Sequence, residues 1–202
     1  MLSTRNIFWL VWVALYAVFF VWYTDLGGAL RPGEIEVYSK KLEEAGFQKE
    51  QVERLQNFMI ADTGKQFFIV NNIKLSSSGL SSRSSDKAMQ KYMDYMWPAL
   101  FSRASHPVFA GNAVFRSLDV TGIEGAEEWD MALIMRYRSR RDMLDIVSNS
   151  SFSSSHDFKV LAMDKTIAYP VEVNLYLSDP RLLIMIFLLV SGMMIQAFIS
   201  RR

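Results

Sequence analysis

The chain has 202 residues, of which 50% are hydrophobic and 13% aromatic, and its 22 lysines and arginines nearly balance 21 aspartates and glutamates for a net charge of +1. This balance excludes a strongly basic nucleic-acid-binding protein and an acidic disordered tail, so no nucleic acid is expected as a partner. The absence of cysteine excludes disulfides, thiolate nucleophiles, iron–sulfur clusters and cysteine zinc sites.

After a short tail, residues 1–6, the segment 7–24 is apolar, and it carries no charge from Ile7 to Tyr23. A helix of this length spans roughly 25 Å, enough to cross a hydrocarbon core. Tryptophan and tyrosine lie near both of its ends, where aromatic rings settle at the membrane interfaces. A cleaved signal peptide is the main alternative, but no small-residue cleavage site follows. We therefore expect a retained transmembrane helix.

A second apolar segment occupies residues 181–199, is uncharged from Leu182 onward, and precedes a basic tail, residues 200–202. Two spans place both termini on one side of the membrane. The positive-inside rule, applied to Arg5 and the final two arginines, favours cytoplasmic termini, although Arg31, Lys40 and Lys41 oppose it. We expect a protein of the lipid bilayer, in a bacterium the inner membrane, with its central domain in the periplasm.

Residues 25–64 are rich in glutamate, lysine and glutamine and predict a helical connector that divides near Gly46. Apolar side chains at helical spacing, among them Val52, Leu55 and Met59, indicate a face that packs on the rest of the protein. The glutamates at 43, 44, 50 and 53 are interpreted as the solvated face and not as a cation site.

Residues 65–178 predict a small α+β domain. Strands are expected over 66–75, 108–120, 129–139 and 167–177, with a helix between residue 86 and His106 and further helical structure over 141–165. The order β-α-β-β-α-β is that of the ferredoxin-like fold. Pro170 cannot donate a ladder hydrogen bond, so the last strand should lie at a sheet edge or contain a bulge.

The spacing of single residues over about 66–176 resembles the dimeric α/β-barrel superfamily, which has the ferredoxin-like fold, and in particular a small branch of unknown function. The residues that carry the resemblance are Asn71, Asn72, Lys74, Tyr92, Tyr95, Gly111 and the segment from Tyr137 to Arg140. The usual members are free-standing soluble domains, whereas this chain adds an apolar segment at each end and a helical connector.

The resemblance implies a homodimer in which two sheets pair into a closed barrel. It also implies that cofactor-free monooxygenases, isomerases and haem enzymes are relatives, so catalysis is a possibility by analogy. His156, in the second helical region, is the candidate general base, with an exposed or capping histidine as the alternative. His106 precedes a proline and is expected to be structural, because two histidines without suitable carboxylate spacing form no metal site.

Alternation along the third strand places Leu133, Met135 and Tyr137 on the helix-packed face and Arg136 and Arg138 on the other. We expect this second face to include Asn72, Asn112 and Arg116 as well. It is interpreted either as a polar ligand-binding face or as a salt-bridged dimer interface. Arg140 and Arg141 extend this basic run, which is expected to be solvated or to meet lipid phosphates or a partner.

The sequence contains no P-loop, nucleophile elbow, zinc-protease or dinucleotide motif, and no cofactor is expected. The main functional hypothesis is therefore a membrane-anchored accessory, assembly or docking subunit of a larger membrane complex, which uses a dimerising ferredoxin-like domain. The alternative is a cofactor-free enzyme or small-molecule sensor with its site in the barrel cavity. A transporter is disfavoured because the two spans carry no charge.

Overall fold

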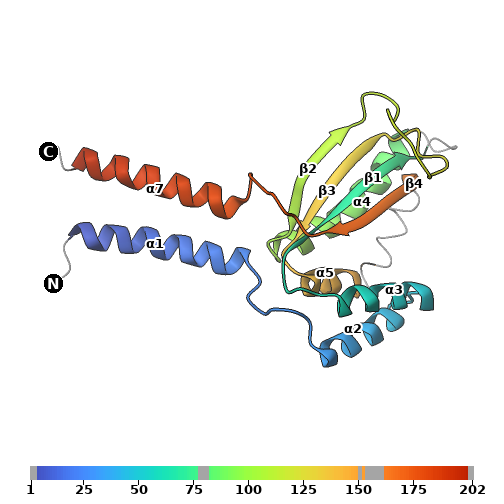
Figure 1. Cartoon of the computed structure of the whole chain (residues 1–202), viewed down its shortest axis with the longest axis horizontal. Helices are drawn as coiled ribbons and strands as arrows, with labels where there is room; N and C mark the ends of the chain where they lie inside the picture. The colour runs from blue at the N-terminus through green and yellow to red at the C-terminus, as the bar shows by residue number, and fades with distance from the viewer. Residues whose placement is uncertain (1–3, 77–81, 150–151, 153–161, 200–202) are drawn as a thin grey trace. The chain divides into compact units, whose positions relative to one another are not determined.

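The computed structural model describes residues 4–76, 82–149, 152 and 162–199 (Figure 1). The chain forms two compact units. The first consists of Met1–Leu26 with Val173–Arg202, and the second of Gly27–Glu172.

The first unit is a pair of helices, α1 (Thr4–Tyr23) and α7 (Pro180–Ile199). Both are long and apolar enough to cross a membrane, judged by length and composition. The indole Nε1 of Trp9 donates a hydrogen bond of 2.7 Å to Oε1 of Gln196. A Cβ atom added at Gly192 would lie 2.9 Å from the Trp9 ring, so the close approach of the two helices depends on this glycine.

The second unit contains a four-stranded sheet of β1 (Phe67–Leu75), β2 (His106–Asn112), β3 (Met131–Tyr137) and β4 (Met163–Val171). The strand order is β2-β3-β1-β4, and every neighbouring pair is antiparallel. The helix α4 (Ser82–Phe101) connects β1 to β2, and α5 (Arg140–Val147) lies between β3 and β4. This is the ferredoxin-like topology that the sequence predicts.

The hydrophobic core lies between one face of the sheet and the helices (Figure 1). Phe67, Met135 and Tyr137 from the strands pack with Leu100 of α4 and Leu144 of α5. These side chains are almost completely buried. The alternation predicted for the third strand is confirmed on this face, because Leu133, Met135 and Tyr137 all contribute to the core.

Two N-terminal helices, α2 (Pro32–Glu44) and α3 (Lys49–Ile60), belong to the same unit. Their division at Gly46 is as predicted, and this residue has a φ of +87°, which glycine adopts without steric cost. Tyr38, Leu42, Val52 and Met59 are buried in the common core. The segment expected as a connector is thus an integral layer of the domain.

The last strand differs from the prediction. β4 starts at Met163 and ends at Val171, whereas the sequence pattern predicted residues 167–177. The reason is its pairing with β1, which runs from Leu75 opposite Met163 to Phe68 opposite Val171. Residues 163–165, predicted as helical, are therefore part of the strand. The prediction for Pro170 is confirmed, since β4 is an edge strand.

The second and third strands are shorter than predicted. β2 ends at Asn112, which pairs with Met131 at the start of β3. Residues 113–130 form a long loop beyond the sheet (Figure 1). The apolar alternation in 113–120 suggested a strand, but the described structure gives these residues no partner strand.

Candidate functional site

The sheet face opposite the core carries an apolar strip. Cross-strand pairing places Val70 opposite Ile134 and Tyr169, and Phe109 opposite Ile134. Ile167, two residues before Tyr169, lies on the same face. The side chains of Phe109 and Tyr169 are 51% and 46% exposed. This face is thus more apolar than the polar face that the sequence analysis predicts. We call these five residues the open-face strip.

A hollow of about 370 Å³ lies at the end of the strip, where β2 and β3 pass into the 113–130 loop. Asn72 and Asn112 line it together with aromatic side chains, which are Phe109, Phe115 and Trp129. A Cβ atom added at Gly111 would lie 3.1 Å from the Phe109 ring, so a larger residue would displace that ring. The structure therefore brings together two of the predicted ligand-binding residues.

A chain of ion pairs lies beside this hollow. Nζ of Lys74 lies 3.0 Å from Oδ1 of Asp130 and 3.7 Å from Oε2 of Glu128. Arg116, another predicted ligand-binding residue, is exposed and pairs with Glu128 at 3.1 Å. These pairs balance the local charge, so the hollow favours an uncharged, hydrogen-bonding ligand over an anion.

The pKa values of Lys74 and Asp130 are consistent with a stable ion pair. The hydrogen bond to Asp130 raises the pKa of Lys74. For Asp130, burial opposes ionisation, but the Leu75 backbone N–H and the Lys74 ammonium outweigh it and lower the pKa. The Leu75 N–H donates to Oδ2 of Asp130 at 2.7 Å. Both partners therefore stay charged around neutral pH.

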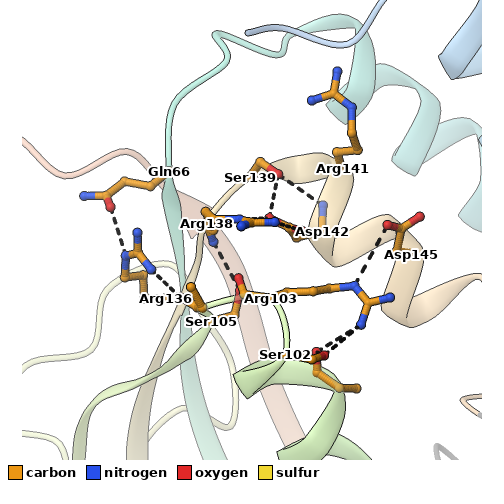
Figure 2. Close-up of polar contacts among 12 residues, drawn as sticks. Gln66, Ser102, Arg103, Ser105, Arg136, Arg138, Ser139, Arg141, Asp142 and Asp145 are labelled. Atoms are coloured by element: carbon orange, nitrogen blue, oxygen red, sulfur yellow. Dashed lines mark hydrogen bonds and ion pairs between the residues drawn. The ribbon is translucent and has the colours of Figure 1, made fainter. Parts of the chain in front are cut away.

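Arg136 lies away from the hollow, contrary to the prediction. It is on the same sheet face, opposite Phe68, but its side chain is completely buried. Its Nε donates to Oε1 of Gln66 at 2.9 Å, and its Nη1 donates to the carbonyl of Ala104 at 2.5 Å (Figure 2). Because these bonds occupy the guanidinium within the protein, Arg136 supports the end of the sheet.

Arg138 also differs from the prediction. Its Nε and Nη2 each lie 2.8 Å from a carboxylate oxygen of Asp142, one turn into α5 (Figure 2). The Asp142 carboxylate accepts a further hydrogen bond of 2.9 Å from the hydroxyl of Ser139, which caps the helix. Arg138 lies beyond the end of β3, so its side chain no longer follows strand alternation. Its contact with Asp142 instead stabilises the first turn of α5.

The next two arginines join α5 to the N-terminal segment. Arg140 is buried, with its Nε 3.3 Å from Oδ1 of Asp62 and its Nη2 3.3 Å from Oε1 of Glu172. Its guanidinium lies 4.3 Å from the ring centroid of Phe58 and also donates to the carbonyl of that residue. The sequence pattern predicted that these arginines are solvated or meet lipid phosphates or a partner, because no local pattern reveals contacts with residues so distant in sequence.

A second set of contacts joins α2 to α5. Arg141 makes two hydrogen bonds to the Glu34 carboxylate, of 2.8 and 3.1 Å. The hydroxyl of Tyr38 donates to Oδ1 of Asp145 at 2.7 Å. The hydrogen bond from Arg141, aided by the backbone N–H of Arg31, lowers the pKa of Glu34 to about 2. These contacts form an architectural cluster around α5. We call it the α5 charge cluster, and its residues are Glu34, Tyr38, Phe58, Asp62, Arg140, Arg141, Asp145 and Glu172.

The histidines add no second site among the described residues. Nδ1 of His106 lies 2.9 Å from the carbonyl oxygen of Pro107. In the described part of the chain, no three side chains of histidine, aspartate or glutamate form a group able to hold a metal ion. His156 lies outside the described residues, and its role as a general base stays a prediction.

Neither a protein-family model nor a curated protein matches this sequence. Among solved structures, the chain is similar to a protein of unknown function from Rhodopseudomonas palustris, with a TM-score of 0.50 and 14% identity over 65% of this chain and 98% of that one. The topology and this similarity show the fold alone.

Two further solved structures have lower TM-scores. One is a dimeric protein of unknown function and ferredoxin-like fold from Bacteroides fragilis, with a TM-score of 0.35 and 12% identity over 54% of this chain and 96% of that chain. The other is a cofactor-independent oxygenase from Streptomyces nogalater, with a TM-score of 0.35 and 7% identity over 57% of this chain and 99% of that chain. The strand order and the similarity at a TM-score of 0.50 show the ferredoxin-like fold that the sequence pattern predicts.

Proposed function

We propose that this protein is a membrane-anchored docking or assembly module whose ferredoxin-like domain forms a homodimer through the open face of its sheet. The observation that carries this proposal is the open-face strip. Contiguous apolar residues on a sheet face are costly to leave in water and are typical of interaction sites. Two such faces can pack against each other with their side chains interdigitating.

The composition of the strip supports a second copy as its partner. Val70, Ile134 and Ile167 are uncharged, so pairing the strip with itself leaves no buried charge without a partner. Phe109 and Tyr169 add large aromatic surfaces, which dominate the energy of many interfaces. A two-fold axis through the strip brings identical apolar surfaces together.

Membrane anchorage is the second part of the proposal. The apolar surfaces of α1 and α7 support their insertion in a bilayer. Arg5, Arg201 and Arg202 favour cytoplasmic termini, which would place the domain in the periplasm of a bacterium. A tethered domain with a second interface would then recruit or position subunits of a larger membrane complex.

Cysteine cross-linking tests the homodimer directly, because the natural chain has no cysteine. The full-length chain is produced in membranes with one cysteine in place of Val70, Phe109, Ile134 or Ile167, and each variant is oxidised. We expect a cross-linked dimer for at least one position, since a disulfide needs Cα atoms within about 7 Å. Val37→Cys, at an exposed site on α2, is the matched control.

Native mass spectrometry in mild detergent complements this experiment. A mass of two chains supports the homodimer, and additional subunits support the docking role. A monomeric mass together with no cross-link at any of the four strip positions would show that the proposed dimer is wrong.

The hollow favours a second candidate function, which is binding of a small uncharged molecule by a sensor or cofactor-free enzyme. Its two amide side chains supply donors and acceptors, and the aromatic rings supply apolar contact. Native mass spectrometry should then detect a bound small molecule that is lost in Asn72→Leu or Asn112→Leu. A variant His156→Ala tests the general base separately, and unchanged turnover would exclude that role.

A further inference from the structure

The 113–130 loop joins the paired strands β2 and β3 and is 18 residues long. Strand connections are usually short, and loops longer than about 12–15 residues are most often functional or disordered. This loop is held in a defined conformation by its own contacts. Its length is therefore better explained by a function than by disorder.

Hydrogen bonds hold the two sides of the loop together. The N–H of Ala113 donates to the carbonyl of Asp130, and the N–H of Ser117 donates to the carbonyl of Glu127, both at 2.8 Å. The Ser117 hydroxyl donates to the carbonyl of Ala126 at 2.8 Å, which also accepts from the Trp129 indole at 3.0 Å. The loop is thus ordered before any partner binds, which lowers the entropic cost of binding.

A contact from β4 fixes the loop further. Nζ of Lys165 lies 4.8 Å from the ring centroid of Trp129 and donates to the carbonyl of Gly125. Gly122 and Gly125 have φ values of +72° and +69°, which allow the tight turns at the tip.

This ordered loop presents large apolar side chains to solvent. Val114 is 97% exposed, Phe115 75% and Leu118 93%. Ile123, near the tip, is 55% exposed. Exposed apolar side chains gathered on one element are typical of a protein interaction site. The loop therefore has the properties of a docking element.

The charge of the loop indicates what it binds. Arg116 is its one positive residue, against five acidic residues, which gives a net charge of 1 − 5 = −4. Glu128 and Asp130 are paired with Arg116 and Lys74. The remaining acids, Asp119, Glu124 and Glu127, are exposed and have no ion pair among the described residues. The loop thus carries three exposed acidic residues together with its exposed apolar side chains.

We propose that the 113–130 loop docks onto a basic, partly apolar surface of another protein. This inference rests on the proposed docking function and names its contact element and the chemistry of its partner. An anionic lipid surface would repel the loop. A second copy would bring two loops of equal negative charge together, which is unfavourable.

Site-specific photo-cross-linking in the full-length chain tests the inference. Benzoylphenylalanine replaces Phe115 or Leu118 in the membranes of the source organism, and the same group at Val37 is the control. We expect both loop positions to give an adduct with a second protein, reduced several-fold at high salt. The combined substitution Glu124→Gln and Glu127→Gln should reduce the adduct in the same way. The cross-linked partner peptide, mapped by mass spectrometry, should lie in a segment of net positive charge.

Every other result overturns the inference. These results are an adduct of two identical chains, an adduct with lipid, an adduct insensitive to salt and to the glutamine substitutions, equal labelling from Val37, or no adduct. The disulfide formed by the open-face variants is measured in the same membranes. If that disulfide persists while the loop gives no adduct, the inference fails and the homodimer stands.

Discussion

The α5 charge cluster and the 113–130 loop are both rich in charged residues, but an ion pair is buried in the cluster, whereas most charges of the loop are exposed. In the cluster, the side chains of Arg140 and Asp62 are buried together as an ion pair of 3.3 Å. In the loop, Asp119, Glu124 and Glu127 face solvent beside exposed Val114 and Leu118. The first arrangement attaches the N-terminal helices to the domain, whereas the second leaves both charge and apolar surface available to a partner.

This difference shows why basic residues in a sequence are weak indicators of a binding site. A guanidinium that is buried with its carboxylate contributes to architecture, and removal of one partner leaves an uncompensated buried charge. Exposed apolar side chains on an ordered loop contribute little to folding and point outward to an interface. Four predictions, from the largest effect to the smallest, test this distinction.

Arg140→Ala should reduce the free energy of unfolding by about 3 kcal/mol, because the buried Asp62 carboxylate loses its cationic partner. Chemical denaturation of the full chain in mild detergent, monitored by circular dichroism, measures this change. Arg54→Ala is the matched control on the exposed face of α3 and should change stability by less than about 0.5 kcal/mol. Equal effects of the two substitutions would contradict an architectural role for the cluster.

Ser139→Ala should cost about 1 kcal/mol, since the Ser139 hydroxyl caps α5 by accepting the backbone N–H of Asp142. The same denaturation measurement applies. Ser139→Thr should restore most of the loss, because threonine keeps the hydroxyl. A threonine variant as unstable as the alanine variant would show that the cap is not the cause.

The Glu34–Arg141 pair should make the domain sensitive to acid. The folded pKa of Glu34 is about 2 against an ordinary value of 4.5, so its contribution is complete above pH 4.5 and is lost as the pH falls toward 2. Solvent screens this carboxylate, which is 34% exposed, so we expect a loss of about 1 kcal/mol. Denaturation at several pH values should show a smaller loss in Glu34→Gln, and parallel curves would refute the prediction.

Phe115→Ser and Leu118→Ser should change the free energy of unfolding by less than about 0.5 kcal/mol each, because both side chains are exposed. Phe115→Ser should also abolish the partner adduct formed by the probe at residue 118, and Leu118→Ser the adduct formed by the probe at residue 115. Leu144→Ala, at a completely buried position, is the contrasting control and should cost about 3 kcal/mol. A large loss of stability in the loop variants would mean that the loop belongs to the core.

The sequence predicted much of the architecture because periodicity reflects burial. The alternation along β3 follows from which face of the sheet meets the core. The edge position of β4 follows from the missing N–H of Pro170. Strand ends were less predictable. Residues 113–120 alternate like a strand, but a strand exists only where a partner pairs with it, and β3 starts at Met131.

The candidate site could be predicted only in part. Asn72 and Asn112 lie at one hollow, as the strand pattern implied. Arg138 was assigned to the same face, but it pairs with Asp142 four residues later, because α5 begins at Arg140. Arg136 was assigned there too, but its contacts with Gln66 and Ala104 depend on how segments distant in sequence meet. No periodicity in the sequence encodes such pairings.

The sequence by itself determined the apolar end segments, the absence of cysteine-based sites and the β-α-β-β-α-β order, because composition and hydrophobic period are local properties. Only the tertiary structure decided which charges are satisfied inside the protein and which face outward. Arg140 and Asp62 become partners through the folding of distant segments, whereas Phe115 stays exposed to solvent.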